Sequence, residues 1–406
     1  MLDDDNVPLP ASSDSEEDVL DDCDTCTPFE LEQHYPQKFR LFDETALSLK
    51  KEYILSLEKD SSLTRLAAGL TDTSVHILDV SSERGLSLFL DLPALPDVKN
   101  NIKVCDVRFF DETPNAVLVG TTNGIVRLFD LRTQKEQARF ENDAIIGTQP
   151  APKNICCFDR NANSRLLCTG TEELHSNVYL VFYDLRERKH MGDYFDCHQS
   201  DVTTLRFHPQ NPDILASGST DGLINTFDLR EASEEDALNI TINTESSVHK
   251  INWHKNVYEK DMLSCITHTN DFKVYESEEG DLLAEFERDN ITEIIKRKSP
   301  ANCNLIDAHS TSDGGILLLT GSNLNKGEIM RSVTYQNKKL LPFANLDGNK
   351  QIVRESVYDA NTNVLITAGE GSIVTIWTPD SHMATNSSGS SKLKAKKSKS
   401  NKANPY

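Results

Sequence analysis

The sequence contains no long run of apolar residues. None approaches the roughly 18 consecutive residues that a membrane-spanning helix needs, and the N-terminus has neither the basic segment nor the apolar core of a secretion signal. The nine Cys are an odd number and are scattered through apparent strands, which favours reduced, buried thiols over a disulfide framework. These absences predict a protein of the nucleus and cytoplasm with no membrane attachment.

Catalytic and cofactor motifs are also absent from the sequence. The chain has no nucleophile elbow, no glycine-rich phosphate loop and no His-Glu-x-x-His pair, and its 11 His are dispersed. Cys23 and Cys26 form a single C-x-x-C with no second ligand pair nearby, so they are weak evidence for zinc. We therefore predict no catalytic residue, no metal site, no cofactor and no enzymatic activity.

The two ends of the chain differ in composition from the middle. Residues 1–32 contain twelve Asp or Glu and no Lys or Arg, which predicts a disordered acidic tail. This tail is either a solvated arm or a segment for basic partners such as histones or ribosomal proteins, which phosphorylation of Ser13 and Ser15 would strengthen. Residues 381–406 carry six Lys and no acid, which predicts a disordered tail that is either solvated or a nuclear localisation signal.

The middle of the chain repeats one pattern, which is most complete from Cys197 to Arg230. There a first apolar run ends at a His-Pro pair, a second runs into the Asp221-Gly222 turn, and a third ends in Asp228-Leu229-Arg230. The Asp228 position recurs at intervals of 44 to 54 residues, and a doubled interval of 102 hides one further unit. A second marker, a Val followed five positions later by an aromatic residue, repeats independently at Val104, Val202, Val248 and Val353.

This unit resembles a WD repeat, the building block of β-propellers made of four-stranded blades. The resemblance implies that a His, a Ser and an Asp link the loops of a blade through hydrogen bonds, and His198, Ser217 and Asp221 stand at those positions. Phe227 stands where the family has Trp, and Phe has no indole N–H to complete the tetrad. Because only two Trp occur in the chain, the resemblance depends more on the period than on signature letters.

We predict an all-β, seven-bladed WD-repeat β-propeller over residues 33–380, with disordered acidic N-terminal and basic C-terminal tails. One marker strand per blade is expected at residues 74–79, 125–130, 178–184, 223–228, 271–276, 327–335 and 372–377. The sixth has the hairpin pattern but lacks both the Asp-Gly turn and the terminal Trp-Asp. A further strand over residues 39–49 should supply the outer strand of the last blade and so close the ring.

Three successive repeats end in Asp-x-Arg, which places Arg132, Arg186 and Arg230 at one rim. In one interpretation each Asp and Arg only satisfies its own turn. In the other, the three guanidinium groups bind an acidic groove on a partner through paired hydrogen bonds. Substrate receptors of cullin-RING ubiquitin ligases carry this ending after Trp, so the resemblance implies docking on the damage-binding adaptor of the ligase. Here Phe or Tyr replaces that Trp.

The resemblance implies a non-enzymatic, monomeric scaffold for protein partners. It is either a substrate receptor of a cullin-RING ubiquitin ligase or a nuclear scaffold or chaperone-like binder of basic proteins in chromatin or ribosome assembly. A hairpin excursion at residues 172–177, on the face opposite the three Arg, is a further candidate contact. Residues 33–380 have 36 Lys and Arg against 52 Asp and Glu, so direct nucleic-acid binding by the ring is disfavoured.

Overall fold

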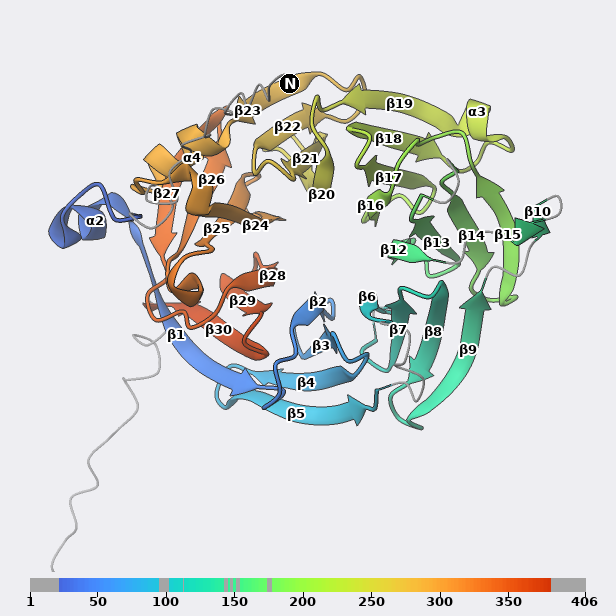
Figure 1. The fold of residues 1–406 in the computed structure, drawn as a ribbon, viewed down its shortest axis with the longest axis horizontal. Helices are drawn as coiled ribbons and strands as arrows, with labels where there is room; N and C mark the ends of the chain where they lie inside the picture. The colour runs from blue at the N-terminus through green and yellow to red at the C-terminus, as the bar shows by residue number, and fades with distance from the viewer. Residues whose placement is uncertain are drawn as a thin grey trace, which may run out of the picture.

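The protein is a ring of β-sheets around a central channel (Figure 1). The computed structural model describes residues 22–94, 102–111, 113–141, 145–146, 149–150, 154–173 and 177–380. The predicted all-β propeller of the WD type is confirmed. Ser13, Ser15 and the predicted C-terminal tail lie outside the described residues. No helix of the described part is long and apolar enough to cross a membrane.

Within the described residues, five separate sheets each consist of four consecutive antiparallel strands. The first strand of each sheet is innermost and the fourth is outermost (Figure 1). The five sheets are β2 (Ile54–Lys59), β3 (Arg65–Leu70), β4 (Val75–Ser81) and β5 (Gly85–Leu92); β6 (Val104–Phe109), β7 (Ala116–Thr121), β8 (Ile125–Asp130) and β9 (Lys135–Glu141); β12 (Ile155–Arg160), β13 (Leu166–Thr171), β14 (Leu180–Asp184) and β15 (Lys189–Tyr194); β16 (Val202–Phe207), β17 (Ile214–Ser219), β18 (Leu223–Asp228) and β19 (Leu238–Asn243); and β20 (Val248–Lys255), β21 (Asp261–Thr267), β22 (Phe272–Glu276) and β23 (Leu282–Phe286).

The rest of the ring is one eight-stranded sheet, in which β1 joins two groups of strands. β1 lies antiparallel to β30, as predicted, from Phe39 opposite Pro379 to Ala46 opposite Ile373. It also lies parallel to β27 through two residues, Gln37 and Lys38. The strands are β24 (Cys303–Ser310), β25 (Ile316–Ser322), β26 (Met330–Gln336), β27 (Lys339–Asn345), β1 (Gln37–Ala46), β30 (Ile373–Pro379), β29 (Val364–Gly369) and β28 (Val353–Asp359).

The architecture therefore differs from the seven separate blades that the sequence predicted. The short parallel pairing between β1 and β27 merges what would be the last two units into one sheet. Periodicity located the strands of both units, but it carries no information about a contact made by a segment from the other end of the chain. Each predicted marker strand overlaps an observed one: β4, β8, β14, β18, β22, β26 and β30.

The few other elements are short. Within the described part they are α2 (Pro28–His34), α3 (Glu234–Ala237), α4 (Arg288–Ile294), η2 (Pro300–Asn302), η3 (Asn325–Gly327) and the two-residue strands β10 (Ile145–Ile146) and β11 (Gln149–Pro150). α2 begins in a capping box, because Thr27 and Glu30 satisfy each other's backbone N–H groups. Residues 22–32 thus differ from the predicted disorder: they contain this helix and ion pairs from Asp22 and Asp24 to Arg297.

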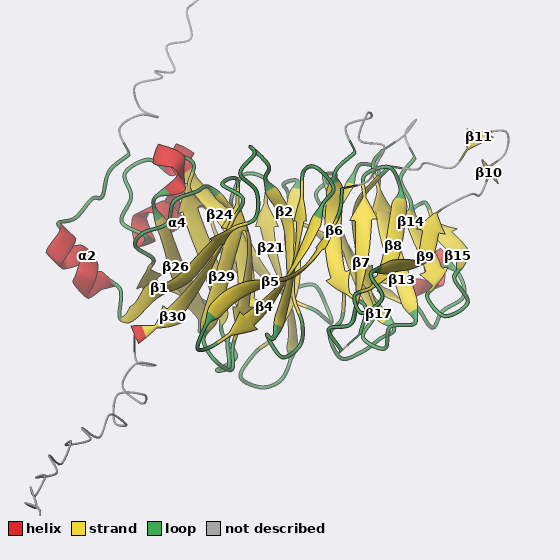
Figure 2. Cartoon of the chain, turned by 90° about the horizontal axis from the view of Figure 1, so that it is seen from below, coloured by secondary structure: helices red, strands yellow, loops and turns green. Residues whose placement is uncertain are grey.

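Antiparallel strands give the ring two distinct faces. The front face, toward the viewer in Figure 1, carries the loops from the second to the third strand of each sheet and those from one sheet to the next. The back face carries the loops from the first to the second and from the third to the fourth strand. Figure 2 shows α4 at the front face and the end of β30 at the back face.

The hydrophobic core lies between neighbouring sheets, where buried aliphatic side chains of one sheet pack against the next. A glycine in the second strand recurs at this boundary. A Cβ atom at Gly218 would lie 2.6 Å from Cγ1 of the fully buried Val248, and the same clash would arise between Gly170 and Val202. The innermost strand can therefore approach the preceding sheet closely only because these positions lack a side chain.

We expect Gly218→Ala to lower the free energy of unfolding by about 1–3 kcal/mol, the usual cost of an added methyl group in a packed core. The measurement is chemical denaturation of the full chain. Gly192→Ala is the matched control, because a Cβ at Gly192 meets nothing within 4 Å. If both variants unfold at the same denaturant concentration, the glycine does not set the distance between the sheets.

Candidate functional site

The central channel is lined by the innermost strands, which share one irregularity. Each has a register shift after its first or third residue, in the five four-stranded sheets and in both halves of the eight-stranded sheet. Such bulges re-aim side chains and increase the local twist. The channel encloses a cavity of about 680 Å³. The residues that follow the register shift all line it: Ser56, Asp106, Cys157, Thr204, Lys250, Asp307 and Glu355.

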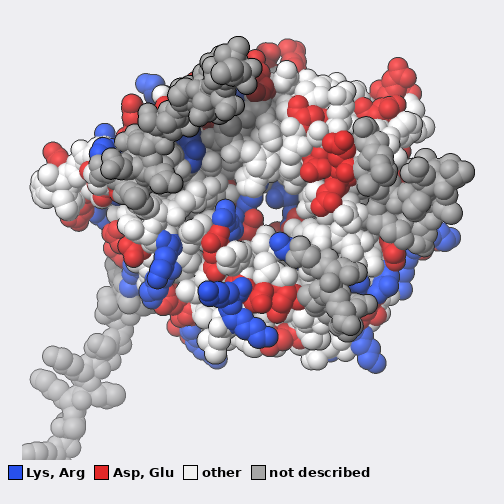
Figure 3. Space-filling model, viewed as in Figure 1, with Lys and Arg blue, Asp and Glu red and all other residues white. Residues whose placement is uncertain are grey.

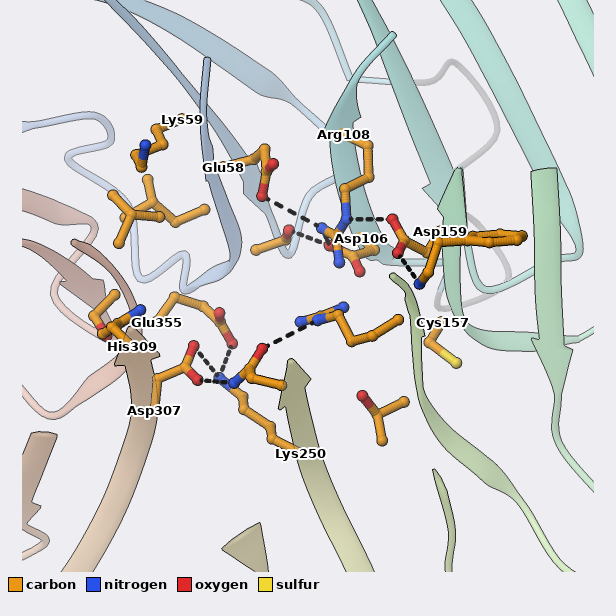
Figure 4. Close-up of a pocket in the computed structure, with 18 of the residues that line it drawn as sticks. Glu58, Lys59, Asp106, Arg108, Cys157, Asp159, Lys250, Asp307, His309 and Glu355 are labelled. Carbon is orange, nitrogen blue, oxygen red and sulfur yellow. Dashed lines mark hydrogen bonds and ion pairs between the residues drawn. The ribbon is translucent and has the colours of Figure 1, made fainter. Parts of the chain in front are cut away.

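Arg108 forms one half of the charged network in this channel (Figure 4). Its Nη1 atom lies 2.5 Å from Asp106 Oδ1 and 3.8 Å from Glu58 Oε2, and its Nε atom lies 3.3 Å from Asp159 Oδ1. The second oxygen of Asp159 accepts the backbone N–H of Phe207 at 2.8 Å. One cation therefore links the innermost strands of three sheets, and Asp159 extends the link to a fourth.

Lys250 forms the other half, opposite Arg108 in Figure 4. Its Nζ atom lies 2.9 Å from Glu355 Oε1 and 3.7 Å from Asp307 Oδ2. Burial opposes ionisation of Asp307, but the Lys250 charge lowers its pKa to about 2. Burial raises the pKa of Glu355 in spite of the same lysine. Asn252 completes the chain of contacts by donating to Asp307 at 2.8 Å.

The titratable groups of the channel favour a structural role. Burial lowers the pKa of His309 and lowers that of His249 to about 3, so both imidazoles are neutral. Burial also raises the pKa of the Cys156 and Cys157 thiols, which disfavours a reactive thiolate. Within the described ranges, no three His, Cys, Asp or Glu side chains are placed to hold a metal ion; Cys23 and Cys26 are free thiols.

The structure brings His198, Ser217 and Asp221 together on the front face. His198 Nε2 lies 2.7 Å from Ser217 Oγ, and His198 Nδ1 lies 3.1 Å from Asp221 Oδ2. Burial would raise the pKa of Asp221, but hydrogen bonds from His198 and from the Gln199 N–H keep it below the usual value. The three side chains thus tie the loop before β16 to the hairpin between β17 and β18.

The hydrogen bond from a Trp indole, which completes the tetrad in the WD family, is absent from the sheet of β16–β19 but is present in β30. Phe227 is fully buried in β18, opposite Leu215 of β17. In the last group of strands, the Trp377 indole N–H donates to Thr367 Oγ1 at 3.0 Å, between β30 and β29. Sequence reasoning missed this pair, although the Thr367 and Trp377 positions correspond to Ser217 and Phe227 in the repeat. The repeat period could have revealed this pair, because it already places Trp377 at the end of the predicted marker strand at residues 372–377.

The three predicted rim arginines lie at third-to-fourth strand turns on the back face. The Arg132 Nη2 atom lies 2.9 Å from Asp130 Oδ2, and Arg230 is ion-paired with Asp228 in the same way. These side-chain contacts lower the pKa of each Asp to about 2. Both Arg side chains remain 70% exposed. Their guanidinium groups are thus partly engaged by their own turns.

Arg186 differs from the other two. Asp184 accepts the backbone N–H groups of Arg186 and Glu187, each at 2.7 Å. Among the described residues, no carboxylate lies within ion-pair distance of the exposed Arg186 guanidinium, although Arg186 is near enough to help lower the pKa of Asp184. Arg186 is therefore the member of the three with the most freedom to contact a partner. The structure brings the three turns to one face but does not bring the three guanidinium groups into a shared site.

The front face gathers carboxylates beside the channel mouth (Figure 3). Glu172 and Glu173 follow β13, Asp201 precedes β16, and Glu245 precedes β20. Glu172 and Asp201 are both close enough to Cys156 to raise its pKa. The loops that carry these four residues, together with the β17–β18 hairpin, contain no Lys or Arg. We call Glu172, Glu173, Asp201 and Glu245 the acidic front surface.

The ring of antiparallel sheets, the hydrogen-bonded His198 and the repeat period define a WD-type β-propeller. A sequence profile described as Nucleolar protein 10-like, N-terminal domain, matches residues 136–330. The resemblance to WD-repeat propellers that the residues indicate is confirmed, and it extends to relatives of WD repeat-containing protein 89.

Two curated relatives cover most of the chain. An uncharacterized WD repeat-containing protein of Saccharomyces cerevisiae is 26% identical over 322 residues, or 77% of this chain and 75% of that protein. The WD repeat-containing protein 89 homolog of Dictyostelium discoideum is 26% identical over 361 residues, or 87% and 92%. A chain of the crystal structure of the mitotic checkpoint complex superimposes with a TM-score of 0.61 at 16% identity, covering 84% of this chain and 92% of that one. That likeness concerns the fold alone.

We expect Ser217→Ala to lower the free energy of unfolding by about 1–3 kcal/mol, because it leaves the buried His198 Nε2 atom without its partner. The measurement is chemical denaturation, and Ser87→Ala, at an exposed strand position, should change the value by less than about 0.5 kcal/mol. Equal stability of Ser217→Ala and the unmodified chain would show that the His198 contacts do not hold the loops.

Proposed function

We propose that this protein is a non-enzymatic scaffold that binds basic protein segments on its acidic front surface. The observation that carries the proposal is the convergence of Glu172, Glu173, Asp201 and Glu245 on one face, from loops without a cation. Lys- and Arg-rich segments pair favourably with such a surface. The predicted candidate contact at residues 172–177 begins with two of these residues, Glu172 and Glu173; residues 174–176 lie outside the described part.

The partner class that fits this chemistry is the basic proteins of chromatin or ribosome assembly. The nucleolar description of the matching profile supports it, and so does the excess of carboxylates over cations in residues 33–380. The same surface would repel the phosphates of nucleic acids. We propose that the protein acts in the nucleus and the cytoplasm, with residues 381–406 as a localisation signal.

We also infer that the two halves of the eight-stranded sheet act as the sixth and seventh blades of the propeller. The pairing of β1 with β27 involves only two residues, whereas its pairing with β30 extends over seven residue pairs. Each half alone would resemble the five separate sheets. Because one chain closes this ring without a second copy, we propose a monomer with the propeller over residues 33–380.

Neutralising the acidic front surface should weaken the binding of basic segments. We expect the triple variant Glu172→Gln, Glu173→Gln and Glu245→Gln to bind a fluorescently labelled oligolysine peptide roughly tenfold more weakly. Each substitution removes one ion pair with the peptide, worth about 0.5 kcal/mol at the surface, and the three losses add up to about a tenfold change in affinity. Glutamine keeps the hydrogen bond that Glu172 accepts from Asn154. Fluorescence anisotropy at low and high salt measures the affinity and its screening.

The matched control removes the same charge from the back face. Glu187→Gln, Glu231→Gln and Glu279→Gln change exposed residues at third-to-fourth strand turns. They should leave oligolysine binding nearly unchanged. If this triple variant weakens binding as much as the front-face variant, the peptide responds only to net charge and the proposed surface is incorrect.

A second candidate function is a substrate receptor of a cullin-RING ubiquitin ligase. The observation that favours it is the exposed rim of Arg132, Arg186 and Arg230, in which the Arg186 guanidinium has no carboxylate partner among the described residues. The ion pairs of Arg132 and Arg230 with their own turns oppose it, since a partner's carboxylates would compete with Asp130 and Asp228.

If the rim docks on the damage-binding adaptor of such a ligase, the variant Arg132→Ala, Arg186→Ala and Arg230→Ala should lose that adaptor. Affinity purification from cell extract, with quantitative identification of bound proteins, measures the loss. Lys103→Ala, Lys326→Ala and Arg354→Ala remove the same charge from exposed front-face positions and should retain the adaptor. Identical partner sets for the rim variant and the unmodified chain would exclude the receptor function.

A further inference from the structure

The N-terminal segment pairs with the ring through an isolated β-bridge beside α4. Asp24 lies opposite Arg297 in an antiparallel bridge, the Thr25 N–H donates to the Lys296 carbonyl at 3.0 Å, and the Lys298 N–H donates to the Cys23 carbonyl at 3.1 Å. Residues two apart in an extended strand point to the same side. The pairing therefore directs the carboxylates of Asp22 and Asp24 toward the same part of the ring.

Two buried arginines receive these carboxylates. The Arg297 Nη2 atom lies 2.8 Å from Asp22 Oδ2 and its Nη1 atom lies 3.0 Å from Asp24 Oδ1. The Arg331 Nη2 atom lies 2.6 Å from Asp24 Oδ1. The Ser299 N–H adds a hydrogen bond to Asp22 at 3.2 Å. The Asp22 side chain is 2% exposed, so this is a built ion-pair site and not a surface contact.

The receiving groups are positioned by the ring itself. Arg331, in β26 and 1% exposed, donates to the Ile295 carbonyl at 2.6 Å and to Asn345 at 3.1 Å. Among the described residues, the buried Nε atom of Arg297 has no hydrogen-bond partner. If residues 22–25 left the site, both guanidinium groups would lose their carboxylate partners. The site therefore favours an acidic occupant.

Outside residues 22–25 the N-terminal segment makes few contacts with the ring before β1. Beyond residues 22–25, the segment is held by Tyr35, whose hydroxyl donates to the Ile295 carbonyl at 3.2 Å, and by the His34 ring at the Ile294 carbonyl. Between these anchors α2 buries no residue, and it stands away from the ring in Figures 1 and 2. If a similar segment replaced residues 22–25, no buried side chain of α2 would be exposed.

We propose that residues 295–299 and Arg331 form a binding site for acidic peptides in which two carboxylates stand two residues apart. Asp22 and Asp24 fill this site as an internal ligand, and an acidic segment of a partner protein replaces them by pairing with residues 296–298 as an added strand. This site is separate from the acidic front surface, and its ligand has the opposite charge.

The test uses the full chain and a fluorescent peptide of residues 18–27 with Ser in place of both Cys. The internal segment competes at an effective concentration of about a millimolar. We therefore expect the peptide to bind the variant Asp22→Asn, Asp24→Asn at least about tenfold more tightly than it binds the unmodified chain, as measured by fluorescence anisotropy. Equal affinity for both chains would overturn the proposal.

Two controls test the chemistry of the site. A peptide with Asn at both Asp22 and Asp24 positions should not bind the variant chain. Adding Arg297→Gln to the variant should abolish binding of the acidic peptide, whereas adding Arg354→Gln, at an exposed front-face arginine, should preserve it. Binding that survives Arg297→Gln would contradict the assignment of the site.

Hydrogen exchange on the unmodified chain gives an answer that does not depend on the stability of any variant. Excess peptide should accelerate exchange of the Thr25 N–H, which loses its acceptor when the internal segment leaves. The Lys298 N–H should stay protected, because the peptide carbonyl replaces that of Cys23. Unchanged protection of Thr25 at saturating peptide would exclude replacement of the internal ligand.

Discussion

Closure of the ring depends on backbone hydrogen bonds between β1 and β30, which join the beginning of the described chain to its end. An open sheet edge would expose unpaired N–H and C=O groups and would be a site for aggregation. Because β1 supplies the outermost strand beside β30, the group β28–β30 gains a fourth strand, as in the five four-stranded sheets. The antiparallel strand order then distributes the loops between the two faces of the closed ring.

The same constraint explains the charged channel. Once the ring is closed, the innermost strands surround a cavity of about 680 Å³. Arg108 and Lys250 then lie beside carboxylates from other sheets. These buried pairs are costly to separate, although they are not by themselves evidence of great stability. Because these charges pair with one another and the imidazoles and thiols are neutral, the channel residues favour a structural role.

The outer faces separate charge in a way that composition alone does not reveal. A chain with a net charge of −22 would be expected to repel acidic ligands everywhere. Yet Arg297 and Arg331 are buried beside α4 and pair with carboxylates, while Glu172 and Glu245 lie on front-face loops that themselves contain no Lys or Arg. The sequence assigned twelve acidic residues to a free tail. Two of them, Asp22 and Asp24, form ion pairs with buried arginines of the same chain.

The sequence by itself determined the strand periodicity, the marker strands and the positions of His198, Ser217 and Asp221, because these features are set by short spacings within one unit. It also indicated the closing strand, predicted at residues 39–49 and observed as Gln37–Ala46, because that segment alternates and precedes the first repeat. Only the tertiary structure decided that β1 would also pair with β27, that Lys250 would meet Glu355, and that Asp22 would reach Arg297. Those contacts join residues from about one hundred to more than three hundred positions apart. Local propensity and hydrophobic period constrain neighbours along the chain, whereas such distant pairs depend on how the whole ring closes.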